Sequence, residues 1–186
     1  MKRTTIIDFV EKYTREFSEL TFLREKVDGV WTETSFRETR EEAHRIGAGL
    51  MQLGLKKGEK VSLLSQGRNL WITSELGILY AGGVNVPLSI KLTESTDLLF
   101  RLQHSDSRFV IVSEQQLGKI RSIIADCPKV EKIIVLDPIE DYKENEIPIS
   151  EVIAKGEEYL KEHAEDFRAV YESIQPDDYA NISHTY

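Results

Sequence analysis

The sequence predicts an α/β protein in which helices cover both faces of a doubly wound, mostly parallel sheet. Short apolar segments alternate with amphipathic segments of helical spacing between residues 60 and 136, which is typical of right-handed crossover units on a parallel sheet. The apolar segments lack a polar face, as expected for strands that are buried on both sides. Connections are short and contain no linker rich in Pro, Gly or Ser, so residues 1–186 are expected to form a single domain.

A helix and a β-hairpin are predicted before the alternating region. Between residues 5 and 17, apolar side chains recur at three- and four-residue steps, as they do on one face of a helix. These residues are Ile6, Phe9, Val10, Tyr13 and Phe17. Asp28-Gly29 then separates the short runs 22–27 and 30–32, and this dipeptide is typical of a tight hairpin turn.

The remaining elements follow in order along the chain. Ser35 and Glu38 form a capping-box pattern, and Gly54 is a typical helix end, so a helix is predicted between them. Strands are then predicted over 60–65, 84–88, 108–112 and 131–136, with helices over 69–81, 93–105 and 114–125. A polar loop over 137–148, a helix over 150–174 and a final strand over 179–183 complete the prediction.

Composition and charge exclude several classes of function. The formal net charge is -8, which argues against a nucleic-acid partner because phosphate neutralisation requires clustered Lys and Arg. The single cysteine, Cys127, makes no intrachain disulfide, and without an acid–base partner in a known pattern it is expected to be an inert buried thiol. We find neither the apolar core of a signal peptide nor a run that could span a bilayer. The sequence therefore predicts a cytoplasmic protein.

The glycines and histidines were considered as site residues. Gly47 and Gly49 lie inside a helical pattern and indicate close helix packing, whereas Gly82-Gly83 ends a helix and precedes a strand, the wrong order for a phosphate loop. The histidines His44, His104 and His163 fall in predicted helices and are expected to be half exposed. Only His184 lies at the end of a predicted strand, where parallel sheets place ligand-contacting groups.

Other functional patterns are missing from the sequence. We find no zinc-binding pair of histidines and no paired carboxylates suited to acid–base catalysis. The tryptophans Trp31 and Trp71 are interpreted as hairpin and core packing rather than as base-stacking platforms. Taken alone, the residues predict an α/β domain without a complete active site.

Four segments, taken in series, share their order and spacing with a known family. They are 34–61 with Leu-Gly-Leu-Lys-Lys-Gly-Glu-Lys-Val at its end, 69–88 with Ala-Gly-Gly-Val-Asn-Val-Pro-Leu at its end, 102–112, and 175–183 with Gln-Pro-Asp-Asp-Tyr-Ala-Asn-Ile-Ser. Together they resemble the adenylate-forming, or AMP-binding, superfamily, which contains the acyl-CoA synthetases. The matching positions look structural: Gly54 and Gly58 in turns, Pro87 at a strand end and Trp71 in the core.

The resemblance implies an enzyme that joins a carboxylic acid to coenzyme A with Mg-ATP and releases AMP. Asn69 and Trp71, with the Leu-rich passage after Pro87, favour the long-chain fatty acid–CoA ligases within the superfamily. The expected partners are the acid, ATP and coenzyme A. The expected location is the cytoplasm, with peripheral contact at the inner face of the membrane in the full-length form.

In the superfamily, the Pro-Asp-Asp strand leads into a loop rich in Thr, Ser and Gly that holds the β- and γ-phosphates of ATP. This sequence reaches only His184-Thr185-Tyr186 at that point, and the family's later motifs are also missing from it. The resemblance therefore implies an incomplete N-terminal part of the large domain, without a C-terminal domain. No catalytic, cofactor-binding or metal-binding residue is transferred from the family. We expect these 186 residues to be inactive alone, to bind no cofactor and to self-associate through uncovered apolar surface.

Two alternatives stay open from the sequence. The chain could be a stand-alone, non-catalytic α/β binding or assembly module of the same ancestry. It could instead be a small-molecule-binding domain of the flavodoxin-like type, unrelated to the ligases. A flavin absorbance or a tight nucleotide complex in the purified protein would favour the second alternative.

Overall fold

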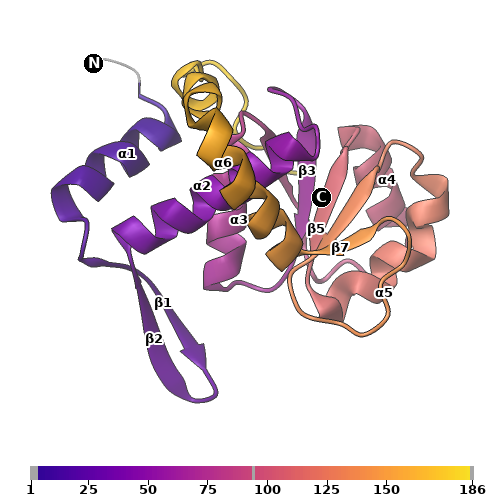
Figure 1. Ribbon diagram of the computed structural model, residues 1–186. Coiled ribbons are helices and arrows are strands. Elements are labelled where there is room, and N and C mark those ends of the chain that lie inside the picture. The colour runs from indigo at the N-terminus through magenta and orange to yellow at the C-terminus, as the bar shows by residue number, and fades with distance from the viewer. Residues whose placement is uncertain (1–3, 94, 185–186) are drawn as a thin grey trace.

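A parallel five-stranded sheet lies at the centre of the computed structural model, which describes residues 4–93 and 95–184 (Figure 1). Its strand order is β4-β3-β5-β6-β7. The strands are β3 (Lys60–Leu64), β4 (Val84–Pro87), β5 (Phe109–Val112), β6 (Lys132–Val135) and β7 (Glu146–Pro148). The helices are α1 (Ile6–Phe17), α2 (Phe36–Gln52), α3 (Asn69–Tyr80), α4 (Ser95–Ser105), α5 (Glu114–Ile123) and α6 (Ile149–Glu172).

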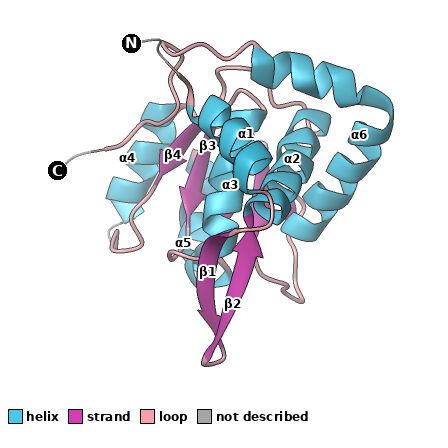
Figure 2. Cartoon of the chain, turned by 90° about the vertical axis from the view of Figure 1, so that its left-hand side faces the viewer, coloured by secondary structure: helices cyan, strands magenta, loops and turns pink. Residues whose placement is uncertain are grey.

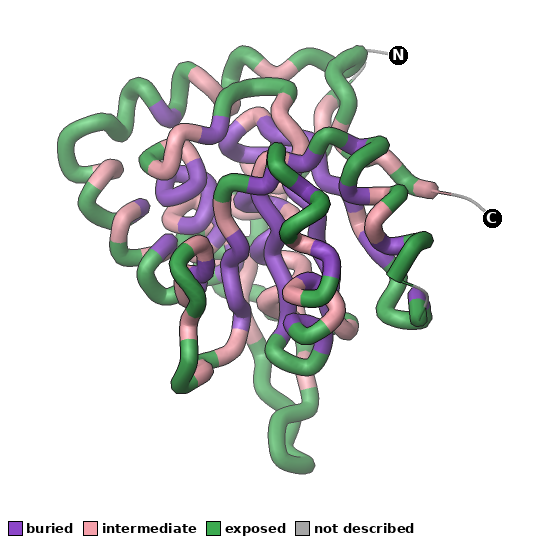
Figure 3. The backbone as a smooth tube through the Cα atoms, turned by 90° about the vertical axis from the view of Figure 1, so that its right-hand side faces the viewer, coloured by how far each residue is buried: buried purple, intermediate pink, exposed green. Residues whose placement is uncertain are grey.

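Helices cover both faces of the sheet, which confirms the predicted fold class. Leucines and isoleucines of α4 and α5 pack on one face, and those of α2, α3 and α6 pack on the other. Leu63, Ile111 and Ile134 are paired across three strands and face the second group of helices. Figure 3 shows the resulting buried centre of the molecule. The strands are apolar throughout because both of their faces are covered.

The N-terminal helix and hairpin also match the prediction. The hairpin consists of β1 (Thr21–Val27) and β2 (Val30–Ser35), and it projects beyond the helices (Figure 2). Asp28 and Gly29 both have positive φ, as a two-residue hairpin turn requires. The side chain of Trp31 is 63% exposed, so the prediction that it packs was wrong. It pairs with Lys26 beside the hairpin turn.

Glycines bring α2 and α6 into backbone contact, as predicted for Gly47 and Gly49. A Cβ atom at Gly49 would lie 2.0 Å from the carbonyl oxygen of Val152, and one at Gly156 would lie 1.8 Å from that of Arg45. Any side chain at these two positions would push the helices apart.

Several helix boundaries differ from the prediction by one or two residues. Helix α5 ends at Ile123 and continues as a short 3₁₀ turn, η1 (Ile124–Asp126). Helix α6 begins at Ile149 and has a non-helical residue at His163. Residue 94 of the predicted helix 93–105 lies outside the described residues, as do Thr185 and Tyr186.

Strand β7 lies inside the segment that was predicted to be a polar loop. It pairs with β6 through Glu146, whose side chain is 1% exposed and forms a bidentate ion pair with Arg121 of α5 at 2.8 and 2.7 Å. The Arg121 guanidinium lowers the pKa of the Glu146 carboxyl, although burial opposes this change. A charged residue can occupy this buried strand because its counter-ion comes from the neighbouring helix. In the described part of the chain, we find no helix with the length and apolar character needed to cross a membrane.

Candidate functional site

The carboxyl end of the sheet between β3 and β5 is the first candidate location for a binding site. The chain leaves these adjacent strands in opposite directions along the sheet, and α/β proteins bind ligands at such a switch point. Here Arg68 donates to both carboxylate oxygens of Asp137 at 2.7 and 3.1 Å. Asp137 also accepts from the backbone N–H of Glu114 at 2.8 Å, at the start of α5. The two terminal nitrogens of Arg68 and the Asp137 carboxylate satisfy one another, and only the buried Arg68 Nε atom has no hydrogen-bond partner among the described residues. Their arrangement is that of a structural ion pair.

The electrostatics of this pair agree with a structural role. Burial raises the pKa of the Asp137 carboxyl, but Arg68 and the Glu114 N–H outweigh burial and lower it. The start of α3 is occupied in the same manner, because Glu25 of the hairpin accepts from the Asn69 N–H at 3.2 Å. The N-termini of α3 and α5 at this end are therefore capped by carboxylates of the chain itself.

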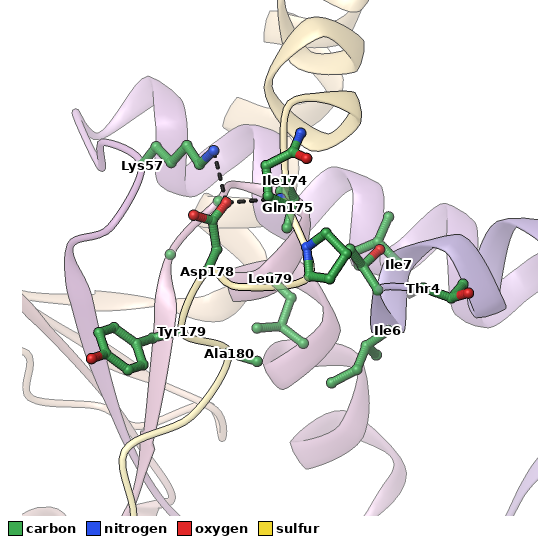
Figure 4. A pocket seen from close by; sticks show the side chains of 14 residues that line it. Thr4, Ile6, Ile7, Lys57, Leu79, Ile174, Gln175, Asp178, Tyr179 and Ala180 are labelled. Carbon is green, nitrogen blue, oxygen red and sulfur yellow. Dashed lines mark hydrogen bonds and ion pairs between the residues drawn. The ribbon is translucent and has the colours of Figure 1, made fainter. Parts of the chain in front are cut away.

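A second location lies where the C-terminal segment 175–183 joins the edge of the sheet (Figure 4). The segment begins with a tight turn in which Asp178 accepts from the Gln175 N–H at 2.9 Å and donates its own N–H to the Gln175 carbonyl at 3.0 Å. Lys57, from the turn before β3, lies 2.8 Å from the Asp178 carboxylate. Lys57 and the Gln175 N–H lower the pKa of Asp178. The turn therefore has a fixed ionic anchor on the body of the domain.

The turn borders a small pocket of about 150 Å³ between the two ends of the chain. Its walls come from the residues before and within α1, from the Gly82-Gly83 turn and from the C-terminal segment. In Figure 4, Leu79 lies between the residues of α1, Ile6 and Ile7, and the C-terminal segment. The charged groups beside the pocket, Lys57 and Asp178, are paired with each other.

The C-terminal segment pairs with β4 at one point only. Asn85 of β4 donates to the Ala180 carbonyl at 3.0 Å and accepts from the Ile182 N–H at 2.9 Å. A strand was predicted over 179–183, but the structure has a single parallel bridge there, at Asn181. Pro87 is the next residue of β4 whose backbone groups point toward the C-terminal segment. Proline has no N–H, so it cannot donate to the Ile182 carbonyl. Pairing stops there for that reason.

His184 follows the bridge and lies against α4. Its ring is 5.6 Å from the ring of His104, and its carbonyl oxygen accepts from Arg101 at 3.5 Å. Burial, with the neighbouring Arg101 and His104, lowers the pKa of His184. Both ring nitrogens are buried and have no hydrogen-bond partner among the described residues. His184 thus lies against the last turns of α4, and its role in a site stays a prediction.

The other histidines and the cysteine have structural surroundings. The His44 side chain is 13% exposed and packs on Tyr80 and Phe167, so the expectation of half exposure was wrong for it. His104 and His163 are exposed. Cys127 is buried, and burial raises the pKa of its thiol. Among residues 4–93 and 95–184, we find no group of three or more metal-ligating side chains.

A buried polar cluster beside His44 joins α1 to α2 and α3. Glu11 accepts from Arg40 at 2.7 Å and from the Tyr80 hydroxyl at 2.8 Å. The His44 Nε2 atom lies 3.4 Å from the same carboxylate, without the geometry of a hydrogen bond. Burial raises the pKa of Glu11, but its His44, Arg40 and Tyr80 neighbours lower it well below its usual range. This cluster has no local signal in the sequence, because Glu11 lies on α1 and Arg40 on α2.

Several expected structural roles are confirmed. Gly54 and Gly58 have positive φ in turns, Pro87 ends β4, and Trp71 packs partly buried against the core. Gly82 also has positive φ and ends α3. Lys57 and Asp178 lie in two of the segments that resemble the family, but no role was predicted for either residue. Their pairing has no local signal, because the two residues are far apart in the chain.

Solved structures identify the class of protein. The anthranilate CoA ligase AuaEII, solved in complex with anthranoyl-AMP, matches 82% of this chain with a TM-score of 0.72 and 28% identity, over 28% of its own length. The A-PCP didomain of a carboxylic acid reductase from Segniliparus rugosus shares the fold alone, with a TM-score of 0.74 at 16% identity over 84% of this chain and 27% of its own. The fold is thus that of the N-terminal α/β region of adenylate-forming enzymes.

Residues 10–185 match the family described as AMP-binding enzyme, and the chain belongs to that family. It is similar to 4-hydroxybutyrate–CoA ligase 2 of Metallosphaera sedula, with 35% identity over 49% of this chain and 16% of the relative. A substituted indenyl-propanoyl:CoA ligase of Rhodococcus jostii is 26% identical over 98% of this chain and 35% of the relative. The chain therefore spans about a third or less of the length of these relatives. Family membership argues against an unrelated flavodoxin-like domain.

Proposed function

We propose that this chain forms the first part of the large domain of an AMP-forming acid–CoA ligase. In that reaction, a carboxylate oxygen attacks the α-phosphorus of ATP and pyrophosphate leaves. The thiol of coenzyme A then attacks the acyl carbon, and AMP leaves. The observation that carries the proposal is the family match over residues 10–185, supported by acyl-CoA and aryl-CoA ligases among the relatives.

We further propose a long-chain fatty acid as the substrate. Support comes from the sequence resemblance and from the long-chain-fatty-acid–CoA ligase FadD15 of Mycobacterium bovis, which is 29% identical over 42% of this chain and 13% of the relative. The relatives also include a 4-hydroxybutyrate–CoA ligase and an anthranilate CoA ligase. A panel of acids of increasing chain length would measure this preference.

In the proposed ligase, ATP would bring Mg²⁺, which neutralises charge on the phosphoryl group being transferred. Magnesium that arrives with a nucleotide is held chiefly by phosphates, water and one or two carboxylates, and no group of three or more metal-ligating side chains among the described residues singles out such carboxylates. We therefore assign no step through the metal to them, and we propose that the 186-residue chain is inactive by itself. Its contribution would be the scaffold on which the phosphate-binding residues are mounted.

Isotopic exchange between ATP and pyrophosphate tests both parts of this proposal. The purified 186-residue chain, supplied with Mg-ATP and palmitate, should show no exchange above buffer. A chimaera in which residues 10–185 replace the matching segment of the Rhodococcus jostii ligase, whose similarity covers 98% of this chain, should show exchange that depends on an added acid. Exchange by the chain alone would contradict its inactivity. A chimaera with native-like circular dichroism but no exchange would contradict the ligase function.

We also propose that the chain self-associates in the cytoplasm through an exposed aromatic face. This face consists of Phe9, Tyr13, Phe17, Phe22 and Phe36, with ring centroids of neighbouring pairs 4.5 to 6.5 Å apart. It surrounds an apolar hollow of about 180 Å³, and exposed apolar surface of this kind favours association. Light scattering should show a dimer that Phe9→Ser weakens and Phe100→Ser, on the exposed side of α4, does not. A wild-type monomer at high concentration would refute the proposal.

A further inference from the structure

The Lys57 ammonium group joins two separate parts of the C-terminal region. Its Nζ atom donates to the carbonyl oxygen of Ser173, the C-cap of α6, at 2.9 Å. The same atom lies 2.8 Å from the Asp178 carboxylate. A cation at a helix C-terminus is favoured by the free carbonyl groups there. Lys57 therefore binds both the end of α6 and the turn that follows it (Figure 4).

These two contacts of Lys57 fix the path of the chain that follows Asp178. Asp178 is held by Lys57 on one side and by the Gln175 N–H on the other. Two residues later, Ala180 and Ile182 bond to the two backbone groups of Asn85 at the sheet edge. The turn and the bridge are adjacent, so a shift of the turn would displace the register of the bridge.

Backbone pairing between the C-terminal segment and β4 then ends at a defined residue. Because Pro87 has no N–H, the Ile182 carbonyl has no donor on β4. The parallel direction of the bridge sets the direction in which the chain leaves Ile182, and His184 then lies against the last turns of α4. The lysine at one end and the proline at the other thus confine the pairing to a single residue.

We propose that Lys57 is a positioning residue, which holds the Gln175–Asp178 turn and thereby sets the path of the chain beyond Ile182. The proposal rests on the proposed function in one respect: in an acid–CoA ligase, the residues on this path would carry the phosphate-binding loop. Lys57 itself touches no substrate. It acts through Asp178 and the end of α6.

Hydrogen exchange of single backbone amides, measured by NMR on the 186-residue chain, tests the proposal. Lys57→Met should accelerate exchange at the Ile182 amide by roughly three- to tenfold, because the lysine supplies one charged hydrogen bond and one ion pair. The amide of Leu136, which bonds to Val112 in the sheet centre, should keep its wild-type rate. Lys57→Arg should restore slow exchange at Ile182, since arginine can reach both acceptors.

Lys56→Met is the matched control, because it removes the neighbouring positive charge without touching Ser173 or Asp178. It should leave the Ile182 amide unchanged. An Ile182 rate that is unaltered in Lys57→Met would overturn the proposal, and so would an equal acceleration at Leu136 or in the Lys56 variant. The measurement requires no catalysis. Its failure would leave the ligase function standing, and a chimaera without exchange activity would leave the role of Lys57 standing.

Discussion

Replacing Gly156 by alanine is the sharpest test of the contact between α2 and α6. The new Cβ atom would lie 1.8 Å from the Arg45 carbonyl oxygen and 2.9 Å from the Gly49 nitrogen. Real Cβ atoms essentially never approach closer than 3.0 Å, so the two backbones must separate by at least about 1.2 Å, the difference between 3.0 and 1.8 Å. Because both partners are backbone atoms, no side-chain rotation can relieve the overlap.

The change in the free energy of unfolding caused by Gly156→Ala combines two opposing contributions. Overpacking of a close interface costs about 3 kcal/mol at the upper end of the usual range, and the better helix propensity of alanine returns about 1 kcal/mol. We therefore expect Gly156→Ala to lower the free energy of unfolding by about 2 kcal/mol, which corresponds to a fall in Tm of about 4–8 °C for a chain of this size. Urea denaturation should show a lower midpoint with an unchanged slope.

Gly118→Ala is the matched control, because Gly118 lies within α5 and a Cβ atom there meets nothing within 4 Å. This variant should be more stable than wild type by about 0.5–1 kcal/mol, from helix propensity alone. The reasoning is refuted if Gly156→Ala is as stable as wild type or if both variants gain stability alike. Either result would mean that α2 and α6 are not in backbone contact.

Two further predictions concern charged groups. The lowered pKa of Glu11 means that its stabilising contribution is complete above about pH 4.5 and is lost as the pH falls below that value. Urea midpoints between pH 6 and 3 should therefore fall more steeply for wild type than for Glu11→Gln. Glu16→Gln, at an exposed position, should keep the wild-type dependence of the midpoint on pH. Arg121→Met should lower the urea midpoint clearly, because it leaves the buried Glu146 carboxylate without its counter-ion. Arg168→Met, which breaks an exposed pair, should have little effect, and equal effects of the two arginine variants would contradict the assignment.

Sequence reasoning succeeded where the signal was local and repeated. The apolar segments of β3, β5 and β6 are buried on both faces, and their composition alone distinguishes them from the amphipathic helices. The capping box predicted at Ser35 marks the start of α2; the one at Thr5, which marks the start of α1, was not predicted. Gly47 and Gly49 indicated a close contact, but the glycine on the opposing helix, Gly156, could not be paired with them from sequence.

The errors arose where the deciding group lies elsewhere in the chain. Strand β7 begins with Glu146, whose charge made the segment look like a loop, and only the distant Arg121 makes its burial possible. The segment 179–183 has the composition of a strand, yet its pairing is limited by the missing N–H of Pro87 on the partner strand. The pairing of Lys57 with Asp178 was missed for the same reason.

The contact between α2 and α6 also sets the order in which the molecule can be completed. All the strands of the sheet are synthesised before α6, and α6 supplies Ile149 and Val152 to the core on the same face as α2 and α3. Until α6 leaves the ribosome, that face exposes apolar side chains that the finished protein buries. Contacts between segments so distant in the chain form slowly, and partly covered sheets are prone to aggregate. A nascent chain that ends before residue 149 is therefore the form most in need of a chaperone.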